Sequence, residues 1–235
     1  MIETTLARIR AQGHWHIRFR PQVIRERFPS AADCEQAVAR NRVSVRAWQY
    51  PAVFSGSPLI KREYQEDGYT QAMELDDHVD TWKMYHSGEF VHYLALREDW
   101  IPEFSRDARL REVPARARFS FEDALVVSSE IYEFLHCLTR SRVYDVPVDV
   151  TVELHGLRGR EVWIHGHGRS PLYDQYVAAH DTFTWKRTHS SDEMLIQMPR
   201  LSAGLLVALF DTFGLKFSVD RMDREVERVF SLQYE

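Results

Sequence analysis

The chain has 235 residues, of which 44% are hydrophobic and 12% aromatic, and it carries a net charge of −5. This length allows a folded chain to bury about 70% of its unfolded surface, and the aromatic content argues against disorder. Two cysteines are too few for a disulfide framework, and no stretch approaches the roughly 18 apolar residues of a membrane-spanning helix. Residues 1–15 lack the apolar run of a secretory signal, so we expect a cytoplasmic protein.

The charge is divided between two neighbouring segments. Residues 1–62 carry eleven basic and four acidic side chains, a net charge of +7, whereas residues 63–99 carry two basic and ten acidic ones, a net charge of −8. Such asymmetry marks an anionic partner or is neutralised within the fold. We favour neutralisation within the fold.

The first part of the chain is predicted to form strands and short helices. Apolar and polar residues alternate over 14–20, which predicts a half-buried strand. Ser30 and Asp33 have the spacing of a helix cap, and Asp67-Gly68 favours the tight turn of a hairpin over residues 59–75. The other elements expected here are a strand at 43–50, a helix at 76–87 ended by Gly88, and a strand at 90–97.

The second part is predicted to contain the longest helix. Ser120 and Asp123 are spaced to cap a helix over 121–140, whose apolar side would face a sheet. The sequence also predicts a loop at 99–118, strands at 148–155, 161–167 and 182–188, and helices at 201–213 and 220–232. Together they predict one α+β domain over residues 1–235, with a mostly antiparallel or mixed sheet packed by a long central helix and two C-terminal helices.

The first candidate site combines basic and aromatic side chains near the N-terminus. If the strands at 14–20 and 43–50 lie together, these side chains would share one surface. Arginine neutralises phosphate charge and flat rings stack on unpaired bases, so the surface would suit nucleic acid. The favoured alternative is that a helix or the acidic segment covers this face. The candidate nucleic-acid-binding residues are Arg18, Arg20, Arg46, Trp48 and Tyr50, with His16 beside them.

The second candidate site is the polar face of a hairpin over residues 148–167. Keeping the apolar residues of both strands on the buried side pairs His155 with Glu161. A face rich in histidine can bind a divalent metal or transfer protons, but no HExxH or CxxC motif accompanies it. We therefore favour a solvated polar face and predict no metal and no cofactor. The weak catalytic candidates are Glu153, His155, His165 and His167.

Acidic residues of the long helix form a third cluster. Glu130, Glu133 and His136 are spaced by three, so they share one side of the helix. Buried carboxylates there would be placed for proton transfer, but a salt bridge to an arginine on an adjacent strand is the favoured interpretation. The sequence has no GxxxxGK[ST], GxSxG or EF-hand motif and no GxGxxG after a strand, which disfavours the common nucleotide-binding and hydrolase classes.

Three segments carry a resemblance. They are SVRAWQYP at 44–51, HVDTWKMYHSGEFVHYLALREDW at 78–100 and SSEIYEFLHCL at 128–138. With them, most of the chain resembles a widespread group of uncharacterised bacterial proteins, related segments of which accompany Schlafen-like nucleic-acid-associated domains. The resemblance implies a nucleic-acid or antiviral setting and assigns no catalytic residue.

These observations favour a binding function. We expect a non-catalytic binding or assembly component of a bacterial multi-protein system, with a protein partner, nucleic acid as a further candidate partner, and no membrane contact. The alternative is a metal-dependent hydrolase or nuclease that uses the histidine and acid face of the 148–167 hairpin. A small-ligand sensor is the third hypothesis.

Overall fold

Antiparallel strands make up the centre of the molecule. The computed structural model describes residues 2–46, 48–53, 59–75, 78–100, 117–164, 172 and 174–231. The strands are β1 (His14–Pro21), β2 (Ile60–Gln65), β3 (Gly68–Leu75), β4 (His78–Tyr85), β5 (Phe90–Ala95), β6 (Arg118–Ser120), β7 (Val148–His155), β8 (Glu161–Trp163) and β9 (Phe183–His189). Seven of these strands form an antiparallel sheet in the order β2-β3-β4-β5-β1-β7-β9, and β6 pairs with β8 in a second, parallel pair.

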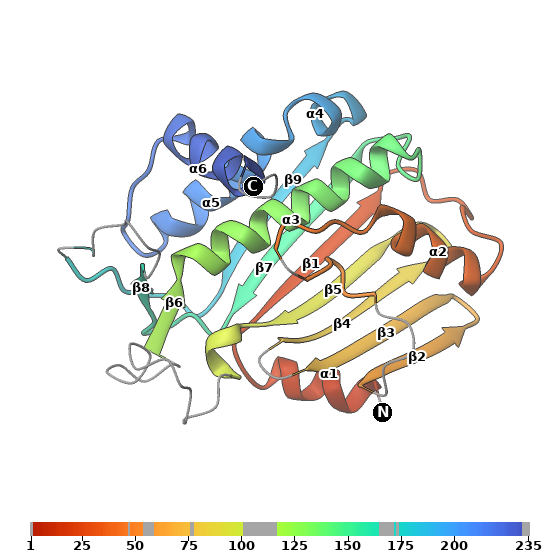
Figure 1. The fold of residues 1–235 in the computed structure, drawn as a ribbon, viewed down its shortest axis with the longest axis horizontal. Helices are drawn as coiled ribbons and strands as arrows, with labels where there is room; N and C mark the ends of the chain where they lie inside the picture. The colour runs from red at the N-terminus through yellow and green to blue at the C-terminus, as the bar shows by residue number, and fades with distance from the viewer. Residues whose placement is uncertain are drawn as a thin grey trace.

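Helices lie on both faces of the large sheet, and all but α1 are on the same face as α3. They are α1 (Ile2–Arg10), α2 (Ala31–Asn41), α3 (Phe121–Arg140), α4 (Ser191–Ile196), α5 (Met198–Asp211) and α6 (Val219–Ser231), with a short 3₁₀ turn η1 (Arg97–Asp99). Helix α3 crosses the sheet, α2 packs over β2 to β4, and α5 and α6 pack against α3 (Figure 1). Most buried apolar side chains form one connected cluster between these layers. The fold is therefore α+β, as the sequence predicts.

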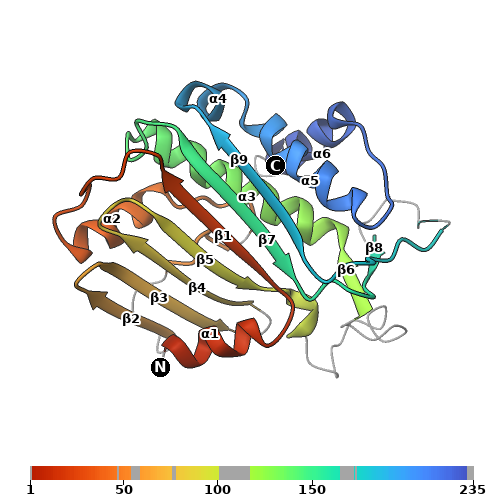
Figure 2. The ribbon, with the colours of Figure 1, turned by 180° about the vertical axis from the view of Figure 1, so that it is seen from behind.

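The opposite face of the sheet is largely open. Helix α1 lies over its lower corner (Figure 2), where Ile9 packs on Val79 and Ala95. On β1 and β7 this face carries polar side chains, because successive residues of a strand point to opposite sides. Every helix within the described ranges is too short or too polar to cross a lipid bilayer.

Local signals explain several elements. The side chain of Ser30 accepts a hydrogen bond from the backbone N–H of Asp33, and Ser120 does the same for Asp123. These caps satisfy backbone donors that a helix leaves unpaired at its start. The predicted strand at 14–20, the hairpin at 59–75 and the helix at 121–140 are confirmed, whereas α1 and α4 were not predicted.

The predicted strand at 43–50 is wrong. Val43 and Tyr50 exchange two backbone hydrogen bonds, of 2.7 and 2.8 Å between nitrogen and oxygen, and these form an isolated bridge. The described residues between them, 44–46, 48 and 49, are not in a strand. Residues 43–50 are called the 43–50 loop below, and Arg46 of this loop forms an ion pair with Glu130 of α3. The segment therefore lies over the sheet and is not part of it.

The predicted helix at 76–87 is also wrong, since residues 78–85 form β4. Val79, Trp82 and Tyr85 have helical spacing, and the alternation expected of a strand is obscured. Helix α1 covers part of the second face of the sheet, so apolar Val79 lies on that face and Trp82 on the other. Gly88, at φ of 84°, closes the turn between β4 and β5 and does not end a helix.

The predicted hairpin of 148–155 with 161–167 does not form. Both edges of β7 are occupied, by β1 on one side and β9 on the other, so β8 pairs with β6. The expected pairing of His155 with Glu161 is therefore wrong, because His155 faces His14 and Glu161 faces Arg118. Long-range pairing has replaced the local pairing that the sequence suggested.

Candidate functional site

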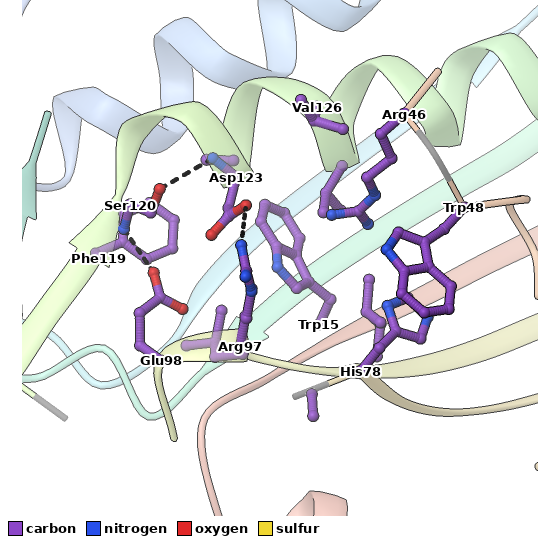
Figure 3. Close-up of a pocket in the computed structure, with 15 residues that line it drawn as sticks. Trp15, Arg46, Trp48, His78, Arg97, Glu98, Phe119, Ser120, Asp123 and Val126 are labelled. Carbon is purple, nitrogen blue, oxygen red and sulfur yellow. Dashed lines mark hydrogen bonds and ion pairs between the residues drawn. The ribbon is translucent and has the colours of Figure 1, made fainter. Parts of the chain in front are cut away.

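A pocket lies between α3 and the sheet, near the end of β5 (Figure 3). Its volume is about 360 Å³. Helix α3 forms one side, the 43–50 loop a second, and residues 94–98, which lead from β5 into η1, a third. The pocket thus joins three segments that are far apart in the sequence.

The inner wall of the pocket is apolar and partly aromatic. Trp15 of β1 and Phe119 of β6 are almost fully buried, and their ring centres lie 6.5 Å apart. Ala124, Val127 and the half-buried Val126 of α3 also line the pocket. These side chains give the pocket an apolar inner wall.

Polar groups gather at the end of the pocket where α3 begins. The backbone N–H of Ser120 donates to Glu98 Oε1 at 2.7 Å, and Ser120 Oγ accepts from the Asp123 N–H at 3.0 Å. Arg97 lies 4.0 Å from the Asp123 carboxylate (Figure 3). Burial and the nearby Asp123 charge raise the pKa of Glu98 to about 7. Glu98 can therefore hold or release a proton near neutral pH.

The 43–50 loop is fixed to α3 by a buried ion pair. Arg46 donates two hydrogen bonds of 2.9 Å to the Glu130 carboxylate, whose side chain is fully buried. Burial raises the pKa of Glu130, and the Arg46 charge opposes this effect. The interpretation of Glu130 as a salt-bridge partner is confirmed, although its arginine comes from a loop and not from a strand.

An aromatic stack forms the rim next to this loop. Trp48 stacks on His78, with ring centres 5.9 Å apart and planes 8° apart (Figure 3). His78 Nε2 lies 3.7 Å from Asp80 Oδ2, which is too long for a hydrogen bond. Within the described part of the chain, this buried nitrogen has no hydrogen-bond partner.

A buried polar chain supports the rim from below. His92 lies between Tyr50 and Asp80, with Nδ1 3.1 Å from the Tyr50 hydroxyl and Nε2 3.2 Å from Asp80 Oδ2. Burial opposes ionisation of Asp80, but its contacts with His78 and His92 lower its pKa to about 2. An ionised Asp80 only accepts, so His92 donates through Nε2 and accepts from Tyr50 through Nδ1.

A second polar cluster lies on the opposite, open face of the sheet. His16 Nδ1 is 3.0 Å from Glu153 Oε2, and His155 Nε2 is 3.5 Å from the same oxygen. His14 stacks on His155, and His16 stacks on Tyr93. Burial lowers the pKa of both His14 and His16. Burial acts to raise the pKa of Glu153, but the hydrogen bond with His16 and the interactions with both neighbouring histidines hold it below its ordinary value.

The predicted nucleic-acid surface is divided by the sheet. Arg18 and Arg20 alternate with buried residues of β1 and point to the open face. Arg46 and Trp48 lie on the other side, at the pocket, and Tyr50 is buried. The expectation that these five residues share one surface is therefore wrong, because residues 43–50 do not pair with β1.

Part of the charge asymmetry is resolved within the fold. Arg18 Nε donates to Glu89 at 2.6 Å, and Lys61 lies 3.1 Å from Glu74. Arg8 also pairs with Glu74. Each of these pairs joins the basic segment 1–62 to the acidic segment 63–99, so the charges of these three basic side chains are neutralised within the fold.

The candidate residues of the second predicted site are only partly placed. Glu153 and His155 lie on the open face of β7, as their alternation predicts. His165 and His167 lie outside the described residues. The histidine that joins Glu153 and His155 is His16, from the neighbouring strand β1.

Sequence reasoning missed the residues that form the polar end and rim of the pocket. Glu98 and Asp123 are 25 positions apart in the sequence, and only the cap at Ser120 hints at their meeting. His78 and His92 meet at Asp80 because β4 pairs with β5, whereas the helix that the sequence predicts at 76–87 would not bring them together.

The chain was compared with models of protein families, with curated proteins and with solved structures, and none of them matches it.

Proposed function

We propose that this protein is a non-catalytic binding domain whose pocket takes up a small, planar, uncharged heteroaromatic group of nucleobase size. The observation that carries the proposal is the pocket itself, whose lining combines an apolar, partly aromatic wall with polar groups of both signs. The size of the pocket, its charge balance and its unsatisfied polar atom each support this ligand class.

The size of the pocket fits a small ligand. Small-molecule sites in proteins have volumes of roughly 300–1,000 Å³ and are mainly apolar with a few placed polar groups. The volume of about 360 Å³ is at the low end of this range. Trp15 and Phe119 make the inner wall apolar, and Trp48, which is 36% exposed and stacks on His78, offers a flat ring at the rim that suits a planar ligand.

The charges around the pocket favour an uncharged ligand. Arg46 is balanced by Glu130, and Arg97 lies beside Asp123. An ionised ligand would lose its hydration on entering the pocket, and these two arginines already lie beside acidic side chains that match their charge, so the loss would not be compensated. A neutral heterocycle loses much less hydration free energy on entering the pocket.

The hydrogen-bonding groups fit the edge of a heterocycle. Buried polar atoms without a partner are rare in proteins, and those that occur at a site commonly meet a ligand or an ordered water. His78 Nε2 is such an atom beside the pocket. Glu98 and Asp123 offer acceptors at the other end, and Glu98 is also a donor when protonated.

The proposal agrees with the nucleic-acid setting that the resemblance implies. Proteins that bind unpaired bases commonly stack them on aromatic side chains and read their edges through hydrogen bonds. The protein partner, the bacterial multi-protein system and the defence setting stay predictions. The hydrolase or nuclease alternative also stays a prediction, and only Glu153 and His155 of its four residues lie in the described part of the chain.

Calorimetric titration with the five common nucleosides tests the proposal. We expect at least one of them to bind with one site per chain. Replacing the half-buried Val126 by tryptophan would fill the pocket from α3 and is expected to abolish this binding. Ile196→Trp adds the same side chain at an exposed position on α4 and should leave binding unchanged.

Two outcomes would overturn the proposal. One is that none of the nucleosides binds the wild-type chain at millimolar concentration. The other is that Val126→Trp, shown by circular dichroism to be folded, binds a nucleoside as tightly as Ile196→Trp does. The second result would place the nucleoside site outside this pocket.

A further inference from the structure

The pairing of β1 with β7 places four metal-ligating side chains in a square on the open face of the sheet. His16 lies directly opposite Glu153, and His14 lies opposite His155. Residues two apart on a strand point to the same side, so both pairs project away from α3. This face is on the other side of the sheet from the pocket, and the inference below is independent of the proposed function.

Three of these side chains converge closely. The ligating atoms of His16, Glu153 and His155 all lie within 4.8 Å of one another. Glu153 Oε2 is 3.0 Å from His16 Nδ1 and 3.5 Å from His155 Nε2. Two ligands of a tetrahedral zinc ion, each bound at about 2.0–2.1 Å, are about 3.3 Å apart. The two observed separations are close to this value.

We propose that His16, Glu153 and His155 bind a zinc ion, with solvent at the fourth position. Two imidazoles and one carboxylate are a ligand set that zinc commonly takes in proteins, and three protein ligands leave one position open. The side chains of the three residues are 22%, 25% and 34% exposed, so water and metal can reach them.

The surroundings hold the ligands in place. His16 stacks on the Tyr93 ring with centres 4.4 Å apart and planes 6° apart, and His155 stacks on His14 at 4.8 Å and 17°. His155 Nδ1 lies 3.4 Å from the Thr182 hydroxyl, which leaves Nε2 directed to Glu153. Such outer contacts fix the ring orientation and tautomer of a metal-bound histidine.

A hollow next to the cluster provides access. Its volume is about 390 Å³, and His14 and His155 line it together with Arg10 and Arg160. A metal ion can approach through this space, and solvent or a small anion can occupy the open position. Access is one of the requirements for a site that exchanges its metal.

A hydrogen-bond network is the competing explanation. It accounts for the 3.0 Å contact of His16 with Glu153, but the 3.5 Å contact of His155 is longer than an ordinary hydrogen bond. A shared metal accounts for both imidazole nitrogens approaching one carboxylate oxygen. The two explanations differ in what happens when metal is added.

Titration of the tag-free protein with Co²⁺ and then Zn²⁺ tests the proposal. We expect one Co²⁺ per chain with the intense visible absorption of tetrahedral cobalt, which zinc then removes. His16→Ala and Glu153→Gln should each weaken the binding by about tenfold or more, since even outer-shell changes can have effects of this size. His180→Ala removes an exposed histidine outside the cluster and should bind as the wild type does.

Far-UV circular dichroism of every variant in EDTA shows whether each chain is folded. If folded His16→Ala binds Co²⁺ as tightly as His180→Ala, the proposed ligands are wrong. The same conclusion follows if the wild type binds no Co²⁺ or Zn²⁺ at one equivalent. If His16→Ala is unfolded, its loss of binding does not count, and Glu153→Gln, which keeps the size of the side chain, provides the test.

Discussion

Replacing Glu98 by glutamine is expected to make the stability of the protein less dependent on pH. Glu98 is buried beside the pocket and accepts a hydrogen bond from the Ser120 N–H at 2.7 Å. Glutamine keeps an acceptor oxygen of similar position and cannot ionise. The substitution therefore removes the buried charge while keeping the hydrogen bond that supports the start of α3.

The size of the effect follows from the pKa. The pKa of Glu98 rises from 4.5 to about 7 on folding. Between these values the folded chain holds a proton that the unfolded chain has lost, so the free energy of unfolding falls as the pH rises. This difference in pKa corresponds to about 3 kcal/mol of unfolding free energy, and the wild type has lost this stabilisation above pH 7. Glu98→Gln should therefore be about 3 kcal/mol more stable than the wild type at pH 8 and similar to it below pH 4.5.

Urea unfolding of the wild type and Glu98→Gln at several pH values between 4.5 and 8 measures this difference. Glu26→Gln, which changes an exposed carboxyl of the loop after β1, is the matched control. We expect the stability difference for Glu98→Gln to grow with pH and the difference for Glu26→Gln to stay small. A difference for Glu98→Gln that is constant over this range would refute the assignment of a raised pKa to this side chain.

Three other substitutions test the 43–50 loop and two turns. Arg46→Met leaves the fully buried Glu130 without its partner and should lower the free energy of unfolding by about 3–5 kcal/mol at pH 8. The loss should shrink at pH 5, because burial raises the pKa of Glu130 and the acid can protonate. Gly68→Ala should cost about 2–3 kcal/mol, since the added methyl would overlap the Met84 carbonyl oxygen. Gly214→Ala meets no neighbouring atom at φ of 80° and should cost only about 1 kcal/mol. Urea unfolding measures all three, and equal costs at the two glycines would contradict the role of the close contact.

Signals carried by neighbouring residues were sufficient for much of the fold. The alternation over 14–20 identified β1, and Ser120 with Asp123 identified the start of α3 at the correct residue. The Asp67-Gly68 pair placed the hairpin turn, where Gly68 contacts the backbone of β4 closely. Each of these signals consists of residues within a few positions of one another in the sequence.

Errors arose where distant segments decide the structure. Strand β4 has apolar residues on both faces because α1 packs on one of them, so its alternation was not visible. Residues 161–163 lost their expected partner because β1 and β9 occupy both edges of β7. The pocket could not be predicted for the same reason, since Trp15, Trp48 and Glu98 meet only through long-range packing.

The indole N–H resonances of the six tryptophans provide the most direct test of the pocket. Trp15 and Trp48 line it, whereas the Trp82 and Trp185 indoles donate hydrogen bonds elsewhere, to Ala52 and Tyr132. In a nitrogen-15 correlation spectrum titrated with the nucleoside that binds, the Trp15 and Trp48 resonances should shift together while those of Trp82 and Trp185 stay in place. Saturable shifts that leave both Trp15 and Trp48 unchanged would contradict the account.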